Sequence, residues 1–491
     1  MSKRILAIVL AFVMLLGTLL LTACNSTDEP PVTDDTTTAK KPDDTTKPVG
    51  GDEEKEPTRE DASPETTENY TGRRYGILAC DTTTFLEPSE TMAQTLADVT
   101  IKRTMYIEDT YGIEFDMNAV YGHDDYTTLQ ASYLGGDQLY DLIMPHPTVN
   151  FTTIITSGMM QDLNDSTALG GHIDTTKLWW NQSNVETYTI DGRLFFCNSD
   201  AQLGIGSFIV MNKDRYDAAY PEEDIYDVIF DGKWTMQKVI DIATENYDKD
   251  AGEYGYTMHR GHVSGFYFSC GETLLKRTSD GGYELKFDVD KTENIAKKVY
   301  DLVIGDHALL DQWWNSTFLD CTAWKTFSSQ DAMMIYMDIG AFGYMVATLD
   351  FQTVYTPLPK FDEKQEKYLS VAGGGCVGIP NDSKDLEFAA FILEVYNWYS
   401  YNYYRPVYID SYLSALIAKN ENDYKIFNMY LDNRYYDLGY ILDSVGIESG
   451  KAIGLLTNVV VENLSTDVAS YIEQYEDSCN TQFQEIISEI Y

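Results

Sequence analysis

The stretch RRYGILA at residues 73–79 and the stretch LYDLIM at residues 139–144 decide the fold of this chain. In the first, apolar residues alternate with other residues, which is typical of a strand, and the second is an apolar run of the kind found in buried strands. Between them the pattern predicts a helix, a strand and a helix, over residues 90–111, 113–120 and 126–134. Strands that alternate with helices predict a parallel sheet covered by helices.

A second set of elements indicates a second sheet. Strands are predicted over residues 208–213, 283–287 and 332–338, with a capped helix over 235–246. The glycine-rich run at 373–380 is expected where the chain crosses between lobes or approaches a ligand. Two more helices are predicted, over residues 386–396 and 468–490.

Two sheets imply two lobes, and the predicted fold class is α/β with a helix-covered, mainly parallel sheet in each lobe. The first lobe is predicted to comprise residues 69–200 plus about 345–400. The second is predicted to comprise about 208–340 plus about 405–491.

The N-terminus has the pattern of an export signal, because two basic residues precede an apolar run over 5–21. The small residues that follow, directly before Cys24, resemble the lipobox of bacterial lipoproteins. We therefore predict a signal peptide over 1–23 and a lipidated Cys24, with a transmembrane anchor as the alternative. Residues 24–68 are rich in Thr, Pro and acidic side chains, which predicts a disordered tether. Anchor, tether and folded body together suggest the outer face of a Gram-positive cell membrane.

The net charge narrows the choice of partners. The chain of 491 residues has 35 Lys and Arg against 78 Asp and Glu, a formal net charge of −43. Such a surface repels nucleic-acid phosphates and anionic lipid head groups, so we expect no nucleic-acid partner and membrane contact through the lipid anchor alone. The six cysteines beyond Cys24 form no C-x-x-C pair, and we expect mostly buried free thiols.

Several segments, taken in order, resemble one known family. They are LWWN at 178–181, IDGRL at 190–194, MNK at 211–213, YDV at 226–228, DGKWT at 231–235, YTPLPKFD at 355–362 and ND at 422–423. This series resembles the bacterial extracellular solute-binding lipoproteins of ABC importers, of the sugar-binding type close to family 1.

The resemblance implies a type II periplasmic-binding-protein-like fold with a hinged cleft between two lobes. It also implies a carbohydrate ligand, an oligosaccharide rather than a monosaccharide, that the protein delivers to the transmembrane subunits of an ABC permease. No catalysis, no cofactor and a monomer are expected. Where many relatives have a loop suited to calcium, this chain reads DKDAG at 248–252, which lacks the full set of carboxylates, so no metal is expected.

Carbohydrate binding requires aromatic faces for the apolar side of the sugar and polar partners for its hydroxyls. Asp81 and Thr83 follow the first predicted strand and His146 follows the third, on the edge where parallel sheets bind ligands. Trp313 and Trp314 lie among polar residues in a predicted loop. The resemblance adds further candidates from the second lobe and from the crossing strands: Ser207, Phe266, Tyr267, Asp338, Phe342 and Gly374.

Other aromatic and histidine motifs favour structural roles. Trp179 and Trp180 are expected in the core more than in a cleft, because large aromatic side chains fill cores more often than they line clefts. His259 and His262 have no third ligand nearby in the sequence and are expected in an ordinary loop.

Two alternatives to a transport protein stay open. The sequence has none of the common hydrolase, metalloprotease, P-loop or dinucleotide-binding motifs. A surface glycoside hydrolase is still compatible, because its two carboxylates need only the right separation in space. A ligand-binding partner of a sensor kinase is compatible as well, since sequence alone does not separate transport from sensing.

Overall fold

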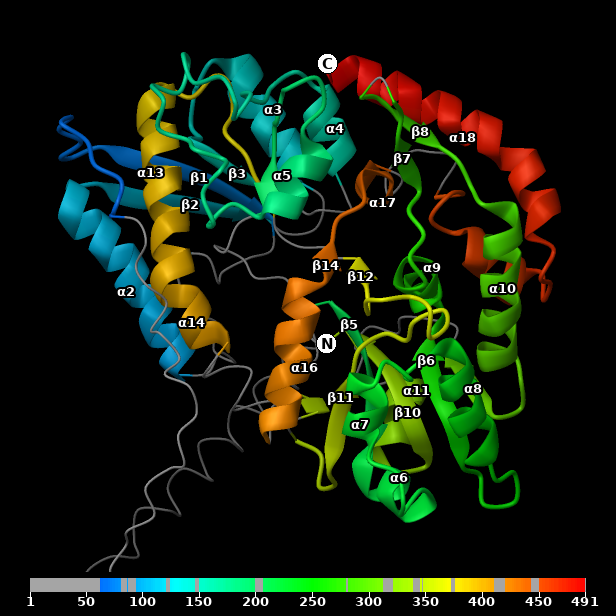
Figure 1. Ribbon diagram of the computed structural model, residues 1–491. Helices are drawn as coiled ribbons and strands as arrows, with labels where there is room; N and C mark the ends of the chain where they lie inside the picture. The colour runs from blue at the N-terminus through cyan, green and yellow to red at the C-terminus, as the bar shows by residue number, and fades with distance from the viewer. Residues whose placement is uncertain are drawn as a thin grey trace, which may run out of the picture. The chain divides into compact units, whose positions relative to one another are not determined.

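The computed structural model describes most of the chain after the predicted tether (Figure 1). The described residues are 62–80, 86, 94–120, 124–145, 150–198, 206–279, 281–311, 321–338, 345–346, 348–371, 376–409, 420–442 and 450–490. The chain divides into two compact units, Met1–Glu60 and Asp61–Tyr491, and all described residues belong to the second. The predicted signal peptide and Cys24 lie outside them. None of the helices described is long and apolar enough to cross a bilayer.

The first sheet has three parallel strands in the order β2-β1-β3. Its strands are β1 (Arg74–Cys80), β2 (Glu114–Val120) and β3 (Leu142–Met144). Helices α2 (Gln94–Tyr111) and α3 (Asp125–Gly135) connect them along the chain. The predicted order of strand, helix, strand, helix, strand is therefore confirmed.

Gly76, the third residue of β1, is required by a close approach of the backbone. A Cβ atom at this position would lie 2.0 Å from the carbonyl oxygen of Leu139. The amide of Gly76 donates to the Asp141 carboxylate at 2.9 Å, and the amide of Asp141 donates to the carbonyl of Gly76 at 2.7 Å. These bonds fix the start of β3 against β1.

Helix α13 (Leu386–Tyr399) packs on this sheet, where the Tyr75 hydroxyl donates to the carbonyl of Ala389 at 3.1 Å. The sequence predicted an amphipathic helix, but every residue from Phe388 to Tyr399 is buried. The reason is that α13 has neighbours on several sides, including the sheet, α2 and the loop that carries Trp179. It is a core helix.

The second sheet has five strands in the order β11-β5-β10-β6-β9. They are β5 (Ser207–Asn212), β6 (Tyr254–His259), β9 (Ala308–Asp311), β10 (Ala332–Asp338) and β11 (Thr353–Thr356). Strands β9, β6 and β10 are parallel, whereas β5 is antiparallel to both of its neighbours. The predicted strands at 208–213 and 332–338 are confirmed, but the sheet is mixed and three of its strands were not predicted.

The helices around the second sheet begin with well-formed caps. They are α6 (Lys213–Ala219), α7 (Ile225–Phe230), α8 (Met236–Glu245), α10 (Val289–Val303) and α11 (Thr322–Ser328). In each, the side chain of the preceding residue accepts a hydrogen bond from a first-turn amide; these residues are Asn212, Asp224, Thr235, Asp288 and Cys321. Such caps satisfy amides that the helix itself leaves without partners. The predicted helix at 235–246 is confirmed as α8.

The chain crosses between the two sheets near their carboxyl edges. Gly378, just after β13 (Cys376–Val377), pairs antiparallel with Ile143 of β3 through backbone bonds of 2.8 and 3.0 Å. Because the segment at Gly378 runs antiparallel to β3, it enters the first sheet at the edge where β3 ends. In the second sheet, Ser207 begins β5 opposite Asp338, the last residue of β10. Both crossings therefore reach their sheets at the carboxyl edge.

Two further small sheets accompany these crossings. β4 (Cys197–Asn198) pairs with β13 on the first-lobe side. β12 (Ser370–Val371) pairs in parallel with β14 (Arg434–Tyr435). Strand β14 belongs to a third crossing between the lobes, which leads from α16 (Glu421–Asp432) to α17 (Leu438–Leu442).

A hairpin and a long helix complete the described chain. The strand predicted at 283–287 exists as β8 (Tyr283–Leu285), but it pairs with β7 (Leu275–Arg277) in a two-stranded sheet and does not join the five-stranded one. The C-terminal helix α18 (Val468–Ile490) has the predicted bounds.

The cysteines beyond Cys24 are all buried and none forms a disulfide, in line with the mostly buried thiols predicted. They are Cys80, Cys197, Cys270, Cys321, Cys376 and Cys479. Burial raises the pKa of Cys270 and of Cys376 to about 12, which keeps both thiols protonated and unreactive at neutral pH.

Glu394 is a buried carboxylic acid at the centre of the first lobe. The indole N–H groups of Trp179 and Trp180 donate to its two oxygens, at 2.8 and 2.9 Å. Burial raises the pKa of Glu394 to about 8, although the two indole hydrogen bonds oppose this shift. Trp179 and Trp180 are thus structural side chains that fix their loop on α13, in agreement with the interpretation from sequence.

This site predicts a specific dependence of stability on pH. Because the folded-state pKa of Glu394 is about 8, above the usual value of 4.5, the folded protein keeps a proton that the unfolded chain loses. Glu394 should stabilise the fold most below pH 4.5, and this contribution should be lost as the pH rises toward 8. We expect Glu394→Gln to flatten the fall of the unfolding free energy between pH 5 and 8, measured by urea denaturation. An equal slope in the variant would contradict the assignment, and Glu387→Gln, an exposed change on the same helix, is the control.

Candidate functional site

A pocket lies where the first lobe is expected to bind ligands, at the carboxyl edge of its sheet. Tyr111, at the end of α2, contacts Phe391 early in α13, whereas Arg103 in the middle of α2 reaches Ser400 just after α13. The two helices are therefore antiparallel. Since α2 leads from the end of β1 to the start of β2, its first turns lie at the carboxyl edge, where parallel sheets bind ligands.

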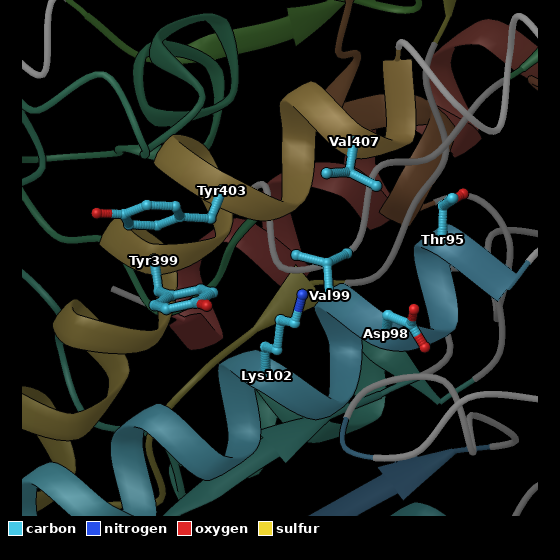
Figure 2. A pocket seen from close by; sticks show the side chains of 7 residues that line it. All are labelled: Thr95, Asp98, Val99, Lys102, Tyr399, Tyr403 and Val407. Atoms are coloured by element: carbon cyan, nitrogen blue, oxygen red, sulfur yellow. The ribbon is translucent and has the colours of Figure 1, made fainter.

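The pocket has a volume of ≈ 370 Å³ and two walls (Figure 2). One wall is the start of α2, with Thr95, Asp98, Val99 and Lys102. The other is the end of α13 and the turns that follow it, with Tyr399, Tyr403 and Val407. We name it the tyrosine pocket.

The two tyrosines are held close together. Their ring centroids are 4.6 Å apart with planes tilted by 35°. They belong to a continuous helical segment, because α13 passes into a π-helical turn, η3 (Ser400–Tyr404), and then into α14 (Arg405–Val407). Irregular turns of this kind are frequent at functional sites. Tyr399 is buried and Tyr403 is half-buried, so the second ring offers more of its surface.

Arg103 makes the tyrosine wall rigid. Its guanidinium lies over the rings of Tyr396 and Tyr404, at 4.2 and 4.5 Å from their centroids, and donates to the Ser400 hydroxyl at 2.9 Å. A buried cation needs partners of this kind to offset the loss of its hydration. The contacts join α2 to the π-helical turn and fix the position from which Tyr403 extends.

The chemistry of the tyrosine pocket suits a polyhydroxylated ligand with an apolar face. Tyr403 supplies an aromatic surface, while Asp98, Lys102 and Thr95 supply an acceptor, a donor and a hydroxyl. Asp98 already accepts a hydrogen bond from Gln94 at 2.7 Å, and a carboxylate has capacity for more. None of the residues that line this pocket was predicted as a ligand contact. The sequence feature that could have indicated this pocket is the tyrosine-rich run YNWYSYNYY at 396–404, which begins where the predicted helix ends.

The carboxyl edge of the second sheet brings together other polar residues. Ser207 and Asp338 are register partners on the neighbouring strands β5 and β10. His259 and Asp311 end β6 and β9 in register. His262 follows closely and stacks on Tyr336 at 4.9 Å. Burial lowers the pKa of His262 to about 3, so this histidine is neutral at physiological pH.

Two of the predicted aromatic contacts, Phe266 and Tyr267, lie in the helix α9 (Gly265–Ser269). Phe266 is buried and packs edge-on against Tyr336, at 5.7 Å between centroids. Tyr267 is buried against Phe268 and Phe287, at 5.5 and 6.1 Å. Both rings are enclosed by other side chains in this structure, and their contact with a ligand stays a prediction.

The remaining predicted contacts are described in part or not at all. The backbone of Asp338 is described, but its side chain is not. Seven of the candidates lie outside the described residues: Asp81, Thr83, His146, Trp313, Trp314, Phe342 and Gly374.

Possible metal ligands do not assemble in the described ranges. No group of three or more His, Cys, Asp or Glu side chains there could hold an ion. Asp248, in the loop DKDAG at 248–252, accepts hydrogen bonds from the amides of Asp250 and Ala251, at 2.9 and 3.1 Å. This carboxylate closes its own turn.

Comparison with known proteins gives matches in structure but not in sequence. No protein-family model matches the chain, and no curated protein matches it either. Among solved structures, it is similar to the galacto-N-biose-/lacto-N-biose I-binding protein of the ABC transporter from Bifidobacterium longum, in complex with lacto-N-biose. The TM-score is 0.58 at 13% identity, covering 86% of this chain and 99% of that one.

Two other solved structures give similar values. The sugar-binding protein MalE from Xanthomonas citri matches with a TM-score of 0.58 at 12% identity, over 84% of this chain and 99% of that one. An ABC substrate-binding protein from Listeria monocytogenes, in complex with cycloalternan, matches with a TM-score of 0.53 at 14% identity, over 84% and 99%. These neighbours are sugar-binding proteins of ABC transporters, and this chain has their two-lobed periplasmic-binding α/β fold.

Proposed function

We propose that this chain is the extracellular substrate-binding component of an ABC importer, which binds a carbohydrate and delivers it to a membrane permease. The observation that carries the proposal is the tyrosine pocket, an aromatic wall facing polar side chains at the carboxyl edge of the first sheet. The structural neighbours support it, because two of them are complexes with lacto-N-biose and with cycloalternan. We expect the binding site to extend from this pocket across the crossing strands, and a site of that length suits an oligosaccharide.

In this mechanism the ring of Tyr403 covers the apolar face of one sugar unit, and Asp98 and Lys102 pair with its hydroxyls. A buried hydroxyl without a partner would be costly, so polar groups at the edge of the ring select the ligand. Residues at the carboxyl edge of the second sheet contact the opposite side. The ligand then stabilises the closed arrangement of the lobes by contacting both, and the closed form docks on the permease.

The proposal includes a location and further contacts. Lipidation of Cys24 would hold a monomeric protein on the outer face of the membrane, with residues 25–68 as its tether. The candidates from sequence are proposed as additional ligand contacts: Asp81, Thr83, His146, Ser207, Phe266, Tyr267, Trp313, Trp314, Asp338, Phe342 and Gly374.

A ligand screen tests the function directly. The protein without residues 1–23 and with Cys24→Ser is heated with oligosaccharides, monosaccharides, peptides and polyamines in turn. A ligand at a hundred times its Kd should add about 2.7 kcal/mol to the apparent stability, which raises the melting temperature. We expect a shift with one class of oligosaccharide and no cleavage of it overnight. Cleavage would indicate a glycoside hydrolase instead, and a shift with peptides alone would contradict carbohydrate binding.

Variants of Tyr403 test the site. Tyr403→Ala removes the aromatic surface and should weaken binding of the sugar found in the screen by about five- to tenfold, or about 1 to 1.4 kcal/mol. Tyr403→Phe keeps the ring and should bind within about twofold of the parent, as measured by isothermal titration calorimetry. Equal affinity in the parent and in Tyr403→Ala would remove the tyrosine pocket from the binding site while leaving the function open.

A further inference from the structure

The β7–β8 hairpin lies between α9 and α10 in the sequence, next to elements of the second lobe, yet it binds an element of the first lobe. Arg277 donates to the carbonyls of Glu186 and Thr189, the latter at 3.1 Å. The Tyr283 hydroxyl donates to the carbonyl of Thr187 at 2.7 Å. These carbonyls belong to the C-terminal end of α5 (Gln182–Tyr188), where the helix leaves acceptors without partners and a cation is favoured.

Arg277 and Tyr283 act as a pair on the hairpin. The guanidinium lies over the tyrosine ring, at 4.9 Å from its centroid, and the two residues are partners in the β7–β8 register. The contact is polar and loosely packed, because a cavity of ≈ 320 Å³ adjoins it. Such an interface can open or slide at lower cost than a packed apolar one.

The base of the hairpin is attached to the third crossing. The buried carboxylate of Asp437 accepts hydrogen bonds from the amide of Leu274, directly before β7, and from the amide of Tyr440, at 2.8 and 2.9 Å. The Tyr435 hydroxyl lies within hydrogen-bond distance of the carbonyls of Phe268 and Glu272, at 3.0 and 3.1 Å. The crossing therefore cannot rotate without moving the hairpin.

Helix α18 covers the outer edge of the hairpin strand β8 and the residues that follow it. Asn480 accepts from the amide of Leu285 and Glu476 from the amide of Phe287, both at 2.9 Å. At its other end, α18 packs on α4 (Phe151–Thr156) of the first lobe, and Ile490 lies in an apolar pocket that includes Phe151. Figure 1 shows α18 (red) extending past β8 toward α4. One helix thus contacts both lobes.

We propose that the β7–β8 hairpin and α18 form a brace across the hinge, which sets the resting angle between the lobes. Any change in that angle must break the bonds of Arg277 and Tyr283 to α5 or displace them along it. The brace opposes free hinge motion and so fixes the proportion of open and closed protein before a ligand arrives. Its importance for uptake rests on the proposed function, but its effect on the hinge does not.

Distance measurements on the protein without ligand test the brace. Fluorescent dyes are attached at Asp109→Cys on α2 and Glu222→Cys before α7, both exposed, in the protein that lacks residues 1–23 and carries Cys24→Ser. We expect Arg277→Ala to broaden the distribution of inter-dye distances and to change the ratio of the two hinge states by about three- to tenfold. Tyr283→Phe, which keeps the ring and removes one bond, should give a smaller change in the same direction.

Lys276→Ala is the matched control. Lys276 is the neighbour of Arg277 on β7, and its ammonium lies 3.6 Å from Glu272 on the same side of the hinge. Its removal takes away the same charge and should leave the distribution as in the parent. Distributions for Arg277→Ala and Tyr283→Phe that match the parent would overturn the brace, and so would an equal change in Lys276→Ala. Because no sugar is present, these outcomes are independent of whether the chain binds carbohydrate.

Discussion

The burial of helix α13 is the constraint on which the first lobe depends. The polar groups that such a helix carries into the core, or that pack against it, cost free energy unless they find partners. The partners of Glu394 are two adjacent indole N–H groups, and those of Arg103 in α2 are two tyrosine rings and the Ser400 hydroxyl. These polar contacts fix the direction in which the chain leaves α13, and hence the position of Tyr403.

The connections between the lobes follow from the edge at which the chain enters each sheet. Strand β5 starts at Ser207, opposite the end of β10, so it must be antiparallel to the parallel strands of the second sheet. The same applies to the segment at Gly378 beside β3. The mixed second sheet is therefore a consequence of the crossings. Since parallel sheets bind ligands at their carboxyl edge, the crossings and the candidate site are neighbours.

The sequence predicted the first lobe better than the second. The first sheet follows a regular alternation of strands and helices. Strands β6, β9 and β11 were missed because they have four to six residues, and a short apolar run does not distinguish a strand from other buried segments. Strand β8 was predicted, but its place in the fold was not. It is held by hydrogen bonds to α18, a helix almost 200 residues further along the sequence, and contacts between such distant segments leave no local pattern.

None of the ligand contacts predicted from the sequence lines the tyrosine pocket. Aromatic and polar residues at the carboxyl edge were expected, yet the pocket is formed by the start of α2 and the turns after α13, which only the packing of the two helices brings together. The expected aromatic residues Phe266 and Tyr267 are enclosed in the second lobe. Local pattern identifies residues with suitable chemistry, whereas their exposure depends on tertiary contacts.

The six buried thiols give this molecule an internal set of reporters. None of them takes part in a disulfide, so the stability of the fold should not depend on the redox potential of its surroundings. Cys80, Cys197 and Cys376 lie in strands on the first-lobe side, whereas Cys270 and Cys321 flank helices of the second lobe and Cys479 lies in α18. A thiol reagent can reach each one only when its own region opens. The rates at which the native protein is alkylated at these positions would therefore map the local opening of each region without any engineered label.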